Sequence, residues 1–190
     1  MARVFFPSCK IKADFPAESE DVRRYLEKQH GVTTTGCCKP CRTQLTDVDQ
    51  AVVICNNCAA IVEESSAAST LTYVWELIDQ DTDFPFPNHS GMQVTIQDCW
   101  AARERRGMQE AIRSLLRKMN IEIVEQEENF NRTRFHGRTL LNPCPPVNAK
   151  LAPRRYENGT SPMFTPMAED EQSICLLYTS PSPRDRQKSR

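Results

Sequence analysis

Short apolar runs alternate with amphipathic stretches through the first half of the chain. Runs of four residues rich in β-branched or aromatic side chains predict buried strands, at residues 3–6, 32–35 and 51–54. Apolar side chains at helical spacing predict helices over residues 17–30, 55–64 and 72–80. Gly31 takes the position in which a glycine commonly ends a helix. This alternation of strands and helices predicts an α/β fold built on an open sheet.

A similar order of elements repeats after a proline-rich connector at residues 84–91. The pattern there predicts a strand at 92–96, a helix over about 101–119 and a strand at 121–124. We therefore expect two similar strand-Cys-helix-strand units, the first at 1–83 and the second, incomplete, at 92–156.

The C-terminal part of the chain carries weaker patterns. Residues 143–153 combine prolines with basic side chains and predict an extended surface segment. We expect residues 157–190 to form an unstructured tail. Within it, residues 175–190 resemble the translation of a sequencing adaptor, so Cys175 would not be a native ligand. The natural chain would then continue beyond Ile174, which leaves the second unit truncated.

Composition narrows the classes of function. The 190 residues carry a net charge of −1, which gives no electrostatic reason to expect nucleic acid or an anionic membrane as a partner. No apolar run approaches the roughly 18 residues of a membrane-spanning helix, and the N-terminus does not have the pattern of a signal peptide. We expect a cytoplasmic location, where thiols stay reduced. Nine cysteines then indicate metal or redox chemistry rather than disulfides.

Cysteines follow each of the three strands predicted in the first unit. They are Cys9, the pair Cys37 and Cys38, and the Cys-x-x-Cys pair Cys55 and Cys58. In an open α/β sheet, the carboxyl ends of the strands lie at the edge where ligands usually bind. We expect the five thiols to meet there, with Cys41 as a sixth cysteine nearby.

Thiolates are the ligands preferred by iron–sulfur clusters, zinc and copper(I), and four are the usual requirement for a [4Fe–4S] cluster or a structural zinc. The side chains of adjacent cysteines diverge, so Cys37 and Cys38 do not easily bind one small tetrahedral ion. They can bind different irons of a larger cluster. The pair therefore favours an iron–sulfur cluster over zinc.

The order Cys…Cys-Cys…Cys-x-x-Cys resembles the cysteine-rich CCG domain. This domain occurs twice in the cysteine-rich subunit of heterodisulfide reductase and in related iron–sulfur oxidoreductase proteins, and the resemblance covers residues 1–155. It implies that Cys9, Cys37, Cys38, Cys55 and Cys58 bind a [4Fe–4S] cluster, possibly of a non-cubane type, with catalysis at the cluster near Cys37 and Cys38. It also implies a redox subunit that takes electrons from a partner protein and reduces a disulfide-like small molecule.

The second unit offers further candidate ligands. Cys99 follows its first strand as Cys9 follows the first strand of the first unit. His136 stands where the first unit has its cysteine pair, and Cys144 follows among prolines. We expect these residues to belong to a second, degenerate site.

Two other functions fit the same residues. The cysteines could form a zinc-binding structural or interaction module. Alternatively, Cys55 and Cys58 could act without metal as a thiol–disulfide oxidoreductase, since Cys-x-x-Cys after a strand is typical of thioredoxin-like redox motifs. The second alternative leaves Cys9, Cys37 and Cys38 without a role.

Overall fold

The computed structural model describes residues 2–99, 102–133 and 146–157. The chain divides into two compact units. The first unit comprises Met1–Asp81 together with Pro146–Asn158, and the second comprises Thr82–Pro145 together with Gly159–Arg190. The sequence pattern assigns residues 146–156 to the second unit, whereas the structure groups them with the first.

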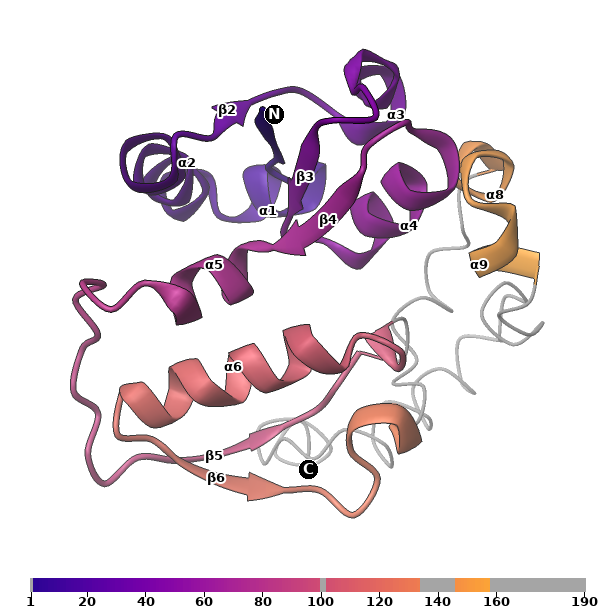
Figure 1. Ribbon diagram of the computed structural model, residues 1–190. Coiled ribbons are helices and arrows are strands. Elements are labelled where there is room, and N and C mark those ends of the chain that lie inside the picture. The colour runs from indigo at the N-terminus through magenta and orange to yellow at the C-terminus, as the bar shows by residue number, and fades with distance from the viewer. Residues whose placement is uncertain (1, 100–101, 134–145, 158–190) are drawn as a thin grey trace. The chain divides into compact units, whose positions relative to one another are not determined.

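The first unit contains a four-stranded parallel sheet, which confirms the α/β fold (Figure 1). Its strands are β1 (Arg3–Phe6), β2 (Thr33–Thr34), β3 (Gln50–Val53) and β4 (Thr70–Tyr73). They lie in the order β2-β1-β3-β4, with Phe6 of β1 beside Val53 of β3 and Val53 beside Tyr73 of β4. The direction of winding therefore reverses between β1 and β3.

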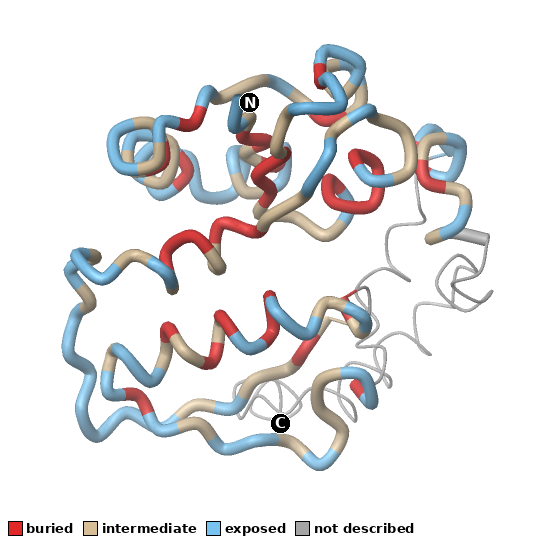
Figure 2. Tube along the Cα trace, in the orientation of Figure 1, coloured by how far each residue is buried: buried red, intermediate tan, exposed pale blue. Residues whose placement is uncertain are grey.

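The two central strands form the core of the first unit (Figure 2). Phe5 and Phe6 of β1 are buried, as is every residue from Ala51 to Val53 of β3. Consecutive buried residues point to opposite faces of a strand, so both faces of the sheet are covered. Continuous apolar runs are typical of such parallel strands, which explains why β1 and β3 were predictable from sequence.

Helices connect these strands. They are α1 (Cys9–Asp14) and α2 (Pro16–His30) between β1 and β2, α3 (Cys38–Cys41) and the 3₁₀ turn η1 (Arg42–Gln44) before β3, α4 (Asn56–Ser65) before β4, and α5 (Val74–Gln80) after it. Gly31 ends α2 in the left-handed conformation, as predicted. The short helix α1 was not predicted, because residues 10–14 alternate charged and apolar side chains without a helical repeat.

The helix expected over residues 72–80 is confirmed for Val74–Gln80, but its expected start was wrong, because Thr72 and Tyr73 belong to a strand. Thr70–Tyr73 forms β4, which pairs with β3, and the helix begins only at Val74. The Glu76 carboxylate accepts a hydrogen bond from the Tyr73 N–H (2.8 Å), which fixes the start of α5. The apolar side chains of the strand and the helix run together in sequence and hide this boundary.

The expectation of an extended segment at residues 143–153 was also wrong for its described part. Residues 146–157 form the helices α8 (Pro146–Leu151) and α9 (Pro153–Glu157), each with proline at its first position, where a missing N–H costs nothing. The N–H groups of Arg154 and Arg155 donate to the Glu64 carboxylate of α4 (2.8 and 3.0 Å). These bonds attach α9 to the first unit.

The second unit contains the predicted strand-helix-strand pattern. Strand β5 (Gln93–Ile96) pairs in parallel with β6 (Glu122–Glu125), and α6 (Arg106–Lys118) connects them. Helix α6 is shorter at its N-terminal end than predicted, and the turn η3 (Phe130–Arg132) follows β6.

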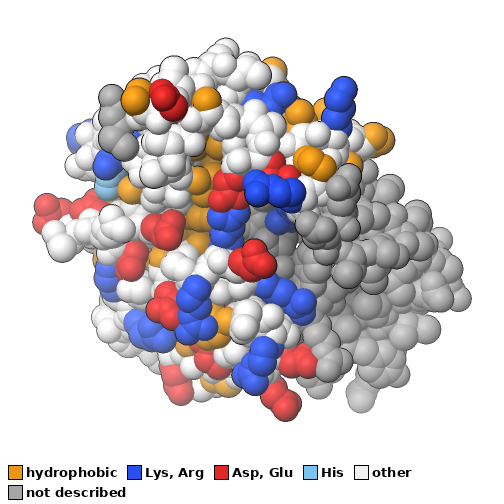
Figure 3. All heavy atoms as spheres, turned by 45° about the vertical axis from the view of Figure 1, so that its right-hand side comes forward, with side chains coloured by type: hydrophobic (Ala, Val, Ile, Leu, Met, Phe, Trp, Pro, Cys, Tyr) orange, Lys and Arg blue, Asp and Glu red, His pale blue; other side chains and the backbone are white. Residues whose placement is uncertain are grey.

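Two general properties of the described residues bear on partners. No helix among them is both long and apolar enough to cross a membrane. On the face shown in Figure 3, the side chains of Lys and Arg lie among those of Asp and Glu. Several charged side chains of the described residues pair within one helix, such as Arg23 with Glu20 and Glu27, and Arg106 with Glu110.

Candidate metal centre

The candidate site lies at the carboxyl edge of the sheet in the first unit. Parallel pairing places the ends of β1, β2 and β3 at one edge, as the cysteine positions predicted. The direction of winding reverses between β1 and β3, and open α/β sheets usually bind ligands at such a point. Cys9 follows β1, and Cys55 and Cys58 follow β3, so candidate ligands come from both strands that flank this point.

Ser8 and Cys9 form the turn after β1. Ser8 is buried and caps α1, because its hydroxyl accepts a hydrogen bond from the Ile11 N–H (3.5 Å). Its backbone has a positive φ of 65°, which a residue with a Cβ rarely adopts. Cys9 is the first residue of α1 and is exposed to solvent.

Cys55 is the N-cap of α4 and has the most acidic thiol of the site. The Cys58 thiol and the N–H groups of Cys58 and Asn57 donate to its sulfur, and so does the Ser8 hydroxyl. Together they lower the pKa of Cys55 to about 5, against an opposing effect of burial. Cys55 is therefore a thiolate at neutral pH.

Cys37 and Cys38 lie where the loop after β2 meets the start of α3. Cys37 is the N-cap of α3, and Cys38 is buried at the start of that helix. The Cys58 thiol donates to the Cys38 sulfur, and this bond is the main cause that lowers the pKa of Cys38 to about 7. The Lys39 ammonium contributes in the same direction.

The five predicted ligands form one continuous line of thiols. The contacts run from Cys9 to Cys37, from Cys37 to Cys38, from Cys38 to Cys58, and from Cys58 to Cys55. Cys58 lies against two sulfurs but has one proton, so it donates to one of them at a time. This role, together with burial, raises the pKa of the Cys58 thiol. Although Cys9 as a residue is exposed, partial desolvation of its thiol and the contact with Cys37 raise its pKa.

Cys41 lies beside this line without joining it. Cys41 is not among the main causes that shift the pKa values of Cys9, Cys38, Cys55 and Cys58. Its sulfur packs instead against Gly36, where an added Cβ would lie only 3.1 Å away. Gly36 thus allows the loop to pass close to Cys41.

Two further residues of the site were not predicted. The Tyr73 hydroxyl donates to the side-chain oxygen of Asn56 (2.8 Å), which ties the end of β4 to the Cys-x-x-Cys turn. Ser8 does the same between β1 and Cys55. Ser8 directly precedes a candidate ligand, and this adjacency was a usable signal. Tyr73 was hidden by the wrong helix assignment.

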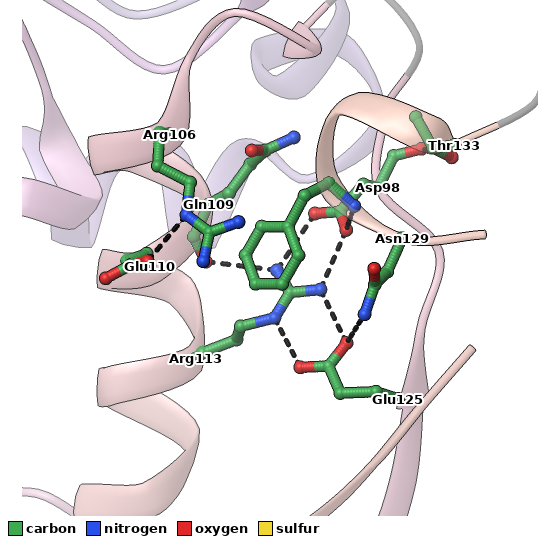
Figure 4. Close-up of polar contacts among 9 residues, drawn as sticks. Asp98, Arg106, Gln109, Glu110, Arg113, Glu125, Asn129 and Thr133 are labelled. Atoms are coloured by element: carbon green, nitrogen blue, oxygen red, sulfur yellow. Dashed lines mark hydrogen bonds and ion pairs between the residues drawn. The ribbon is translucent and has the colours of Figure 1, made fainter. Parts of the chain in front are cut away.

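After β5, in the position that corresponds to the thiols after β1, the second unit has a network of ion pairs around the buried Arg113 (Figure 4). The guanidinium of Arg113, whose side chain is 2% exposed, donates to both oxygens of Asp98 (3.0 and 2.7 Å). It also donates to both oxygens of Glu125 (2.5 and 2.8 Å). This network lowers the pKa of Glu125, chiefly through its bonds with Arg113.

The candidate ligands of the second unit do not assemble within the described residues. Cys99 is partly buried next to Asp98. His136 and Cys144 lie outside the residues that the structure describes. The second site therefore stays a prediction.

The five thiols of the first unit are a donor set that suits either an iron–sulfur cluster or zinc. Across residues 2–99, 102–133 and 146–157, no three His, Cys, Asp or Glu side chains are grouped as ligands of one metal ion. The five thiols instead contact one another in pairs along a line.

Comparison of the chain with protein-family models, with curated proteins and with solved structures gave no match.

Proposed function

We propose that this chain binds an iron–sulfur cluster through Cys9, Cys37, Cys38, Cys55 and Cys58 and serves as an electron-transfer subunit. The observation that carries this proposal is the line of five thiols, delivered by three strands to the carboxyl edge of one sheet. Thiolates are the ligands of iron–sulfur clusters, and two of the five have a pKa at or below neutrality.

The cysteines would have different roles in binding the cluster. Cys55 provides a thiolate at neutral pH without losing a proton, Cys38 with its pKa of about 7 is partly ionised there, and the buried Cys58 has its proton to release. Cys9, at the exposed end of the line, would face solvent and an incoming partner. When bound, the cluster would supply one-electron chemistry.

The resemblance to the cysteine-rich subunit of heterodisulfide reductase suggests the wider role. By this proposal the chain receives electrons from a partner redox protein and passes them to a disulfide-like small molecule. A cytoplasmic location is part of the same proposal.

A metal-free thiol–disulfide centre is the second candidate, and one observation favours it. Cys55 has a pKa of about 5 at the start of α4 and contacts Cys58 directly. A low-pKa cysteine at a helix N-terminus, paired through Cys-x-x-Cys, is typical of thiol–disulfide oxidoreductases. The zinc-binding module is the third interpretation of the same thiols.

Anaerobic purification of the full chain, with iron and acid-labile sulfide analysis and an absorption spectrum, separates these functions. The proposal predicts iron and sulfide in equal amounts with broad visible absorbance. Zinc without sulfide would replace it with the structural module. A metal-free chain whose Cys55–Cys58 disulfide forms and is reduced reversibly would replace it with the thiol centre.

A further inference from the structure

Strand β4 of the first unit ends in a tyrosine, whereas the other three strands lead to cysteines. It pairs in parallel with β3, and its last residue, Tyr73, lies opposite Val53. Its carboxyl end therefore lies at the edge of the sheet that the cysteines share. No cysteine follows β4 in the sequence until Cys99, which belongs to the second unit. Strand β4 thus brings a phenol hydroxyl to the candidate site, and this group is not one of the proposed ligands.

The position of Tyr73 is fixed by its surroundings. The residue is buried, with 3% of its surface exposed. Its N–H donates to the Glu76 carboxylate (2.8 Å), and its strand is paired with β3. A ring packed in the core of a protein has little freedom to turn away. The hydroxyl is therefore held at one point of the sheet edge.

The Tyr73 hydroxyl donates to the side-chain oxygen of Asn56 at 2.8 Å, an ordinary length for such a bond. Asn56 is the first residue of α4 and lies between Cys55 and Cys58 in the Cys-x-x-Cys turn. The bond joins residues 17 positions apart in the sequence. It therefore reaches the turn from a neighbouring strand and does not belong to the turn itself.

A bond at this place acts on both cysteines of the motif. The carbonyl of Cys55 accepts from the Ala59 N–H (3.0 Å), so Cys55, Asn56 and Cys58 belong to one closed helical turn. A rotation of this turn would move both sulfurs together, and the bond from Tyr73 opposes it. Outer partners that orient ligand residues in this way tune how firmly a site holds its metal.

We propose that Tyr73 is a positioning residue whose hydroxyl, fixed at the end of β4, holds Asn56 and thereby sets the orientation of the turn that carries Cys55 and Cys58. Its effect on a bound cluster rests on the proposed function. Its effect on the two thiols does not, because any centre that uses both sulfurs needs them at a fixed spacing.

The first test asks whether the two side chains hold each other. Metal-free, reduced protein is unfolded with urea as the wild type, Tyr73→Phe, Asn56→Ala and the double variant. Tyr73→Phe keeps the buried ring and removes only the hydroxyl. A neutral hydrogen bond predicts a coupling of about fivefold in the unfolding equilibrium of the first unit. Additive losses in the double variant would overturn the proposal.

The second test asks whether the bond reaches the sulfurs. Metal-free protein is equilibrated with reduced and oxidised glutathione, and the Cys55–Cys58 disulfide is quantified by differential alkylation and mass spectrometry. Oxidised glutathione accepts two electrons from the pair and, with two protons, becomes two molecules of reduced glutathione. Tyr73→Phe and Asn56→Ala should each lower the equilibrium constant for this disulfide about fivefold, because a loosened turn must be ordered before the sulfurs can join.

Tyr25→Phe is the matched control for this measurement. The Tyr25 hydroxyl donates to the Asp81 carboxylate (2.6 Å), so the change removes a hydrogen bond of a tyrosine in the same unit. Neither residue lies on the Cys-x-x-Cys turn. Tyr25→Phe should therefore lower stability towards urea and leave the disulfide equilibrium at its wild-type value. Equal shifts in Tyr25→Phe and Tyr73→Phe would assign the effect to a general loosening of the unit and overturn the positioning role.

A third measurement uses iron-loaded protein and separates this proposal from the proposed function. Tyr73→Phe should release iron to a chelator about tenfold faster than the wild type, and Tyr25→Phe should release it at the wild-type rate. A wild-type chain without iron overturns the proposed function, and the glutathione equilibrium still decides whether Tyr73 positions the two thiols. A wild-type disulfide equilibrium in Tyr73→Phe overturns the role of Tyr73, whatever metal the chain binds.

Discussion

The two units share the same strand-helix-strand order. The residues that follow their first strands, β1 and β5, nevertheless differ in chemistry. After β1 stand Ser8 and Cys9, in a site of neutral and anionic sulfurs joined by thiol hydrogen bonds. After β5 stands Asp98, whose carboxylate forms an ion pair with the buried Arg113. The Arg113 guanidinium also pairs with Glu125.

The two sites differ in whether a ligand can replace their internal contacts. A thiol is a weak hydrogen-bond donor, so its contacts are readily replaced by metal–sulfur bonds. The bidentate bonds of Arg113 are strong, and no partner from outside could replace them without leaving a buried charge unpaired. The first edge therefore suits ligand binding, whereas the second keeps its own loop in place.

Phe130 completes the second network. Its N–H donates to Asp98 (2.8 Å), and its ring contacts the guanidiniums of Arg106 and Arg113, whose central carbons lie 3.5 and 3.7 Å from the ring centroid. Two guanidiniums this close cannot share one face of the ring, so they cover opposite faces. The turn after β6 is thereby fastened to the turn after β5.

The largest effect is expected from Arg113→Ala. Removing the guanidinium leaves the buried Asp98 carboxylate unpaired and should destabilise the second unit by about 3–5 kcal/mol. Urea-dependent hydrogen exchange of the β5 and β6 amides measures this loss. Arg24→Ala, which removes an exposed pair with Asp21, is the control and should change nothing measurable. Equal effects of the two variants would show that the network is not structural.

Phe130→Ala should cost about 2 kcal/mol in the same assay, because both guanidiniums lose their contact with the ring. Phe130→Leu keeps an apolar side chain but no aromatic face, so it should recover only part of the loss. Full recovery with leucine would assign the effect to packing alone.

The first unit offers a smaller test. Gly36→Ala brings a methyl group against the Cys41 sulfur and should destabilise the metal-free first unit by about 1 kcal/mol. Adding Cys41→Ala removes the obstructing sulfur and should cancel most of that cost, as urea unfolding can measure. Additive losses in the double variant would contradict the close contact.

The smallest effect concerns pH. Because the network lowers the folded-state pKa of Glu125 below its unfolded value of about 4.3, this stabilisation is complete above that pH. It is lost as the pH falls through the folded pKa. Glu125 is partly exposed, so its share is less than about 1 kcal/mol. Glu125→Gln should reduce the acid dependence of stability in the second unit, whereas an unchanged pH profile would exclude this role.

The sequence correctly predicted those strands and helices whose local hydrophobic pattern agrees with their place in the fold. The runs that predict β1, β2 and β3, with the cysteines that follow them, are sufficient to place five side chains at one edge of a sheet. Parallel pairing brings these residues together, because strand ends in such a sheet share an edge.

The sequence failed where distant contacts decide the outcome. Strand β4 exists because it pairs with β3, and α9 is attached by Glu64, about 90 positions earlier in the chain. Arg113 lies on a helix whose charged residues predict a solvated face, yet its side chain is buried by ion pairs with Asp98, which follows β5, and with Glu125 of β6. No local pattern marks these partners.

The most direct test of the central claim is a set of single Cys→Ser variants of the full chain, each analysed anaerobically for iron and sulfide. If five thiols form one site, Cys9→Ser, Cys37→Ser, Cys38→Ser, Cys55→Ser and Cys58→Ser should each lower the iron content or alter the visible spectrum. Cys41→Ser should match the wild type, because Cys41 lies beside the line without joining it. Full loading in Cys38→Ser and Cys58→Ser, at the buried centre of the line, would contradict the claim.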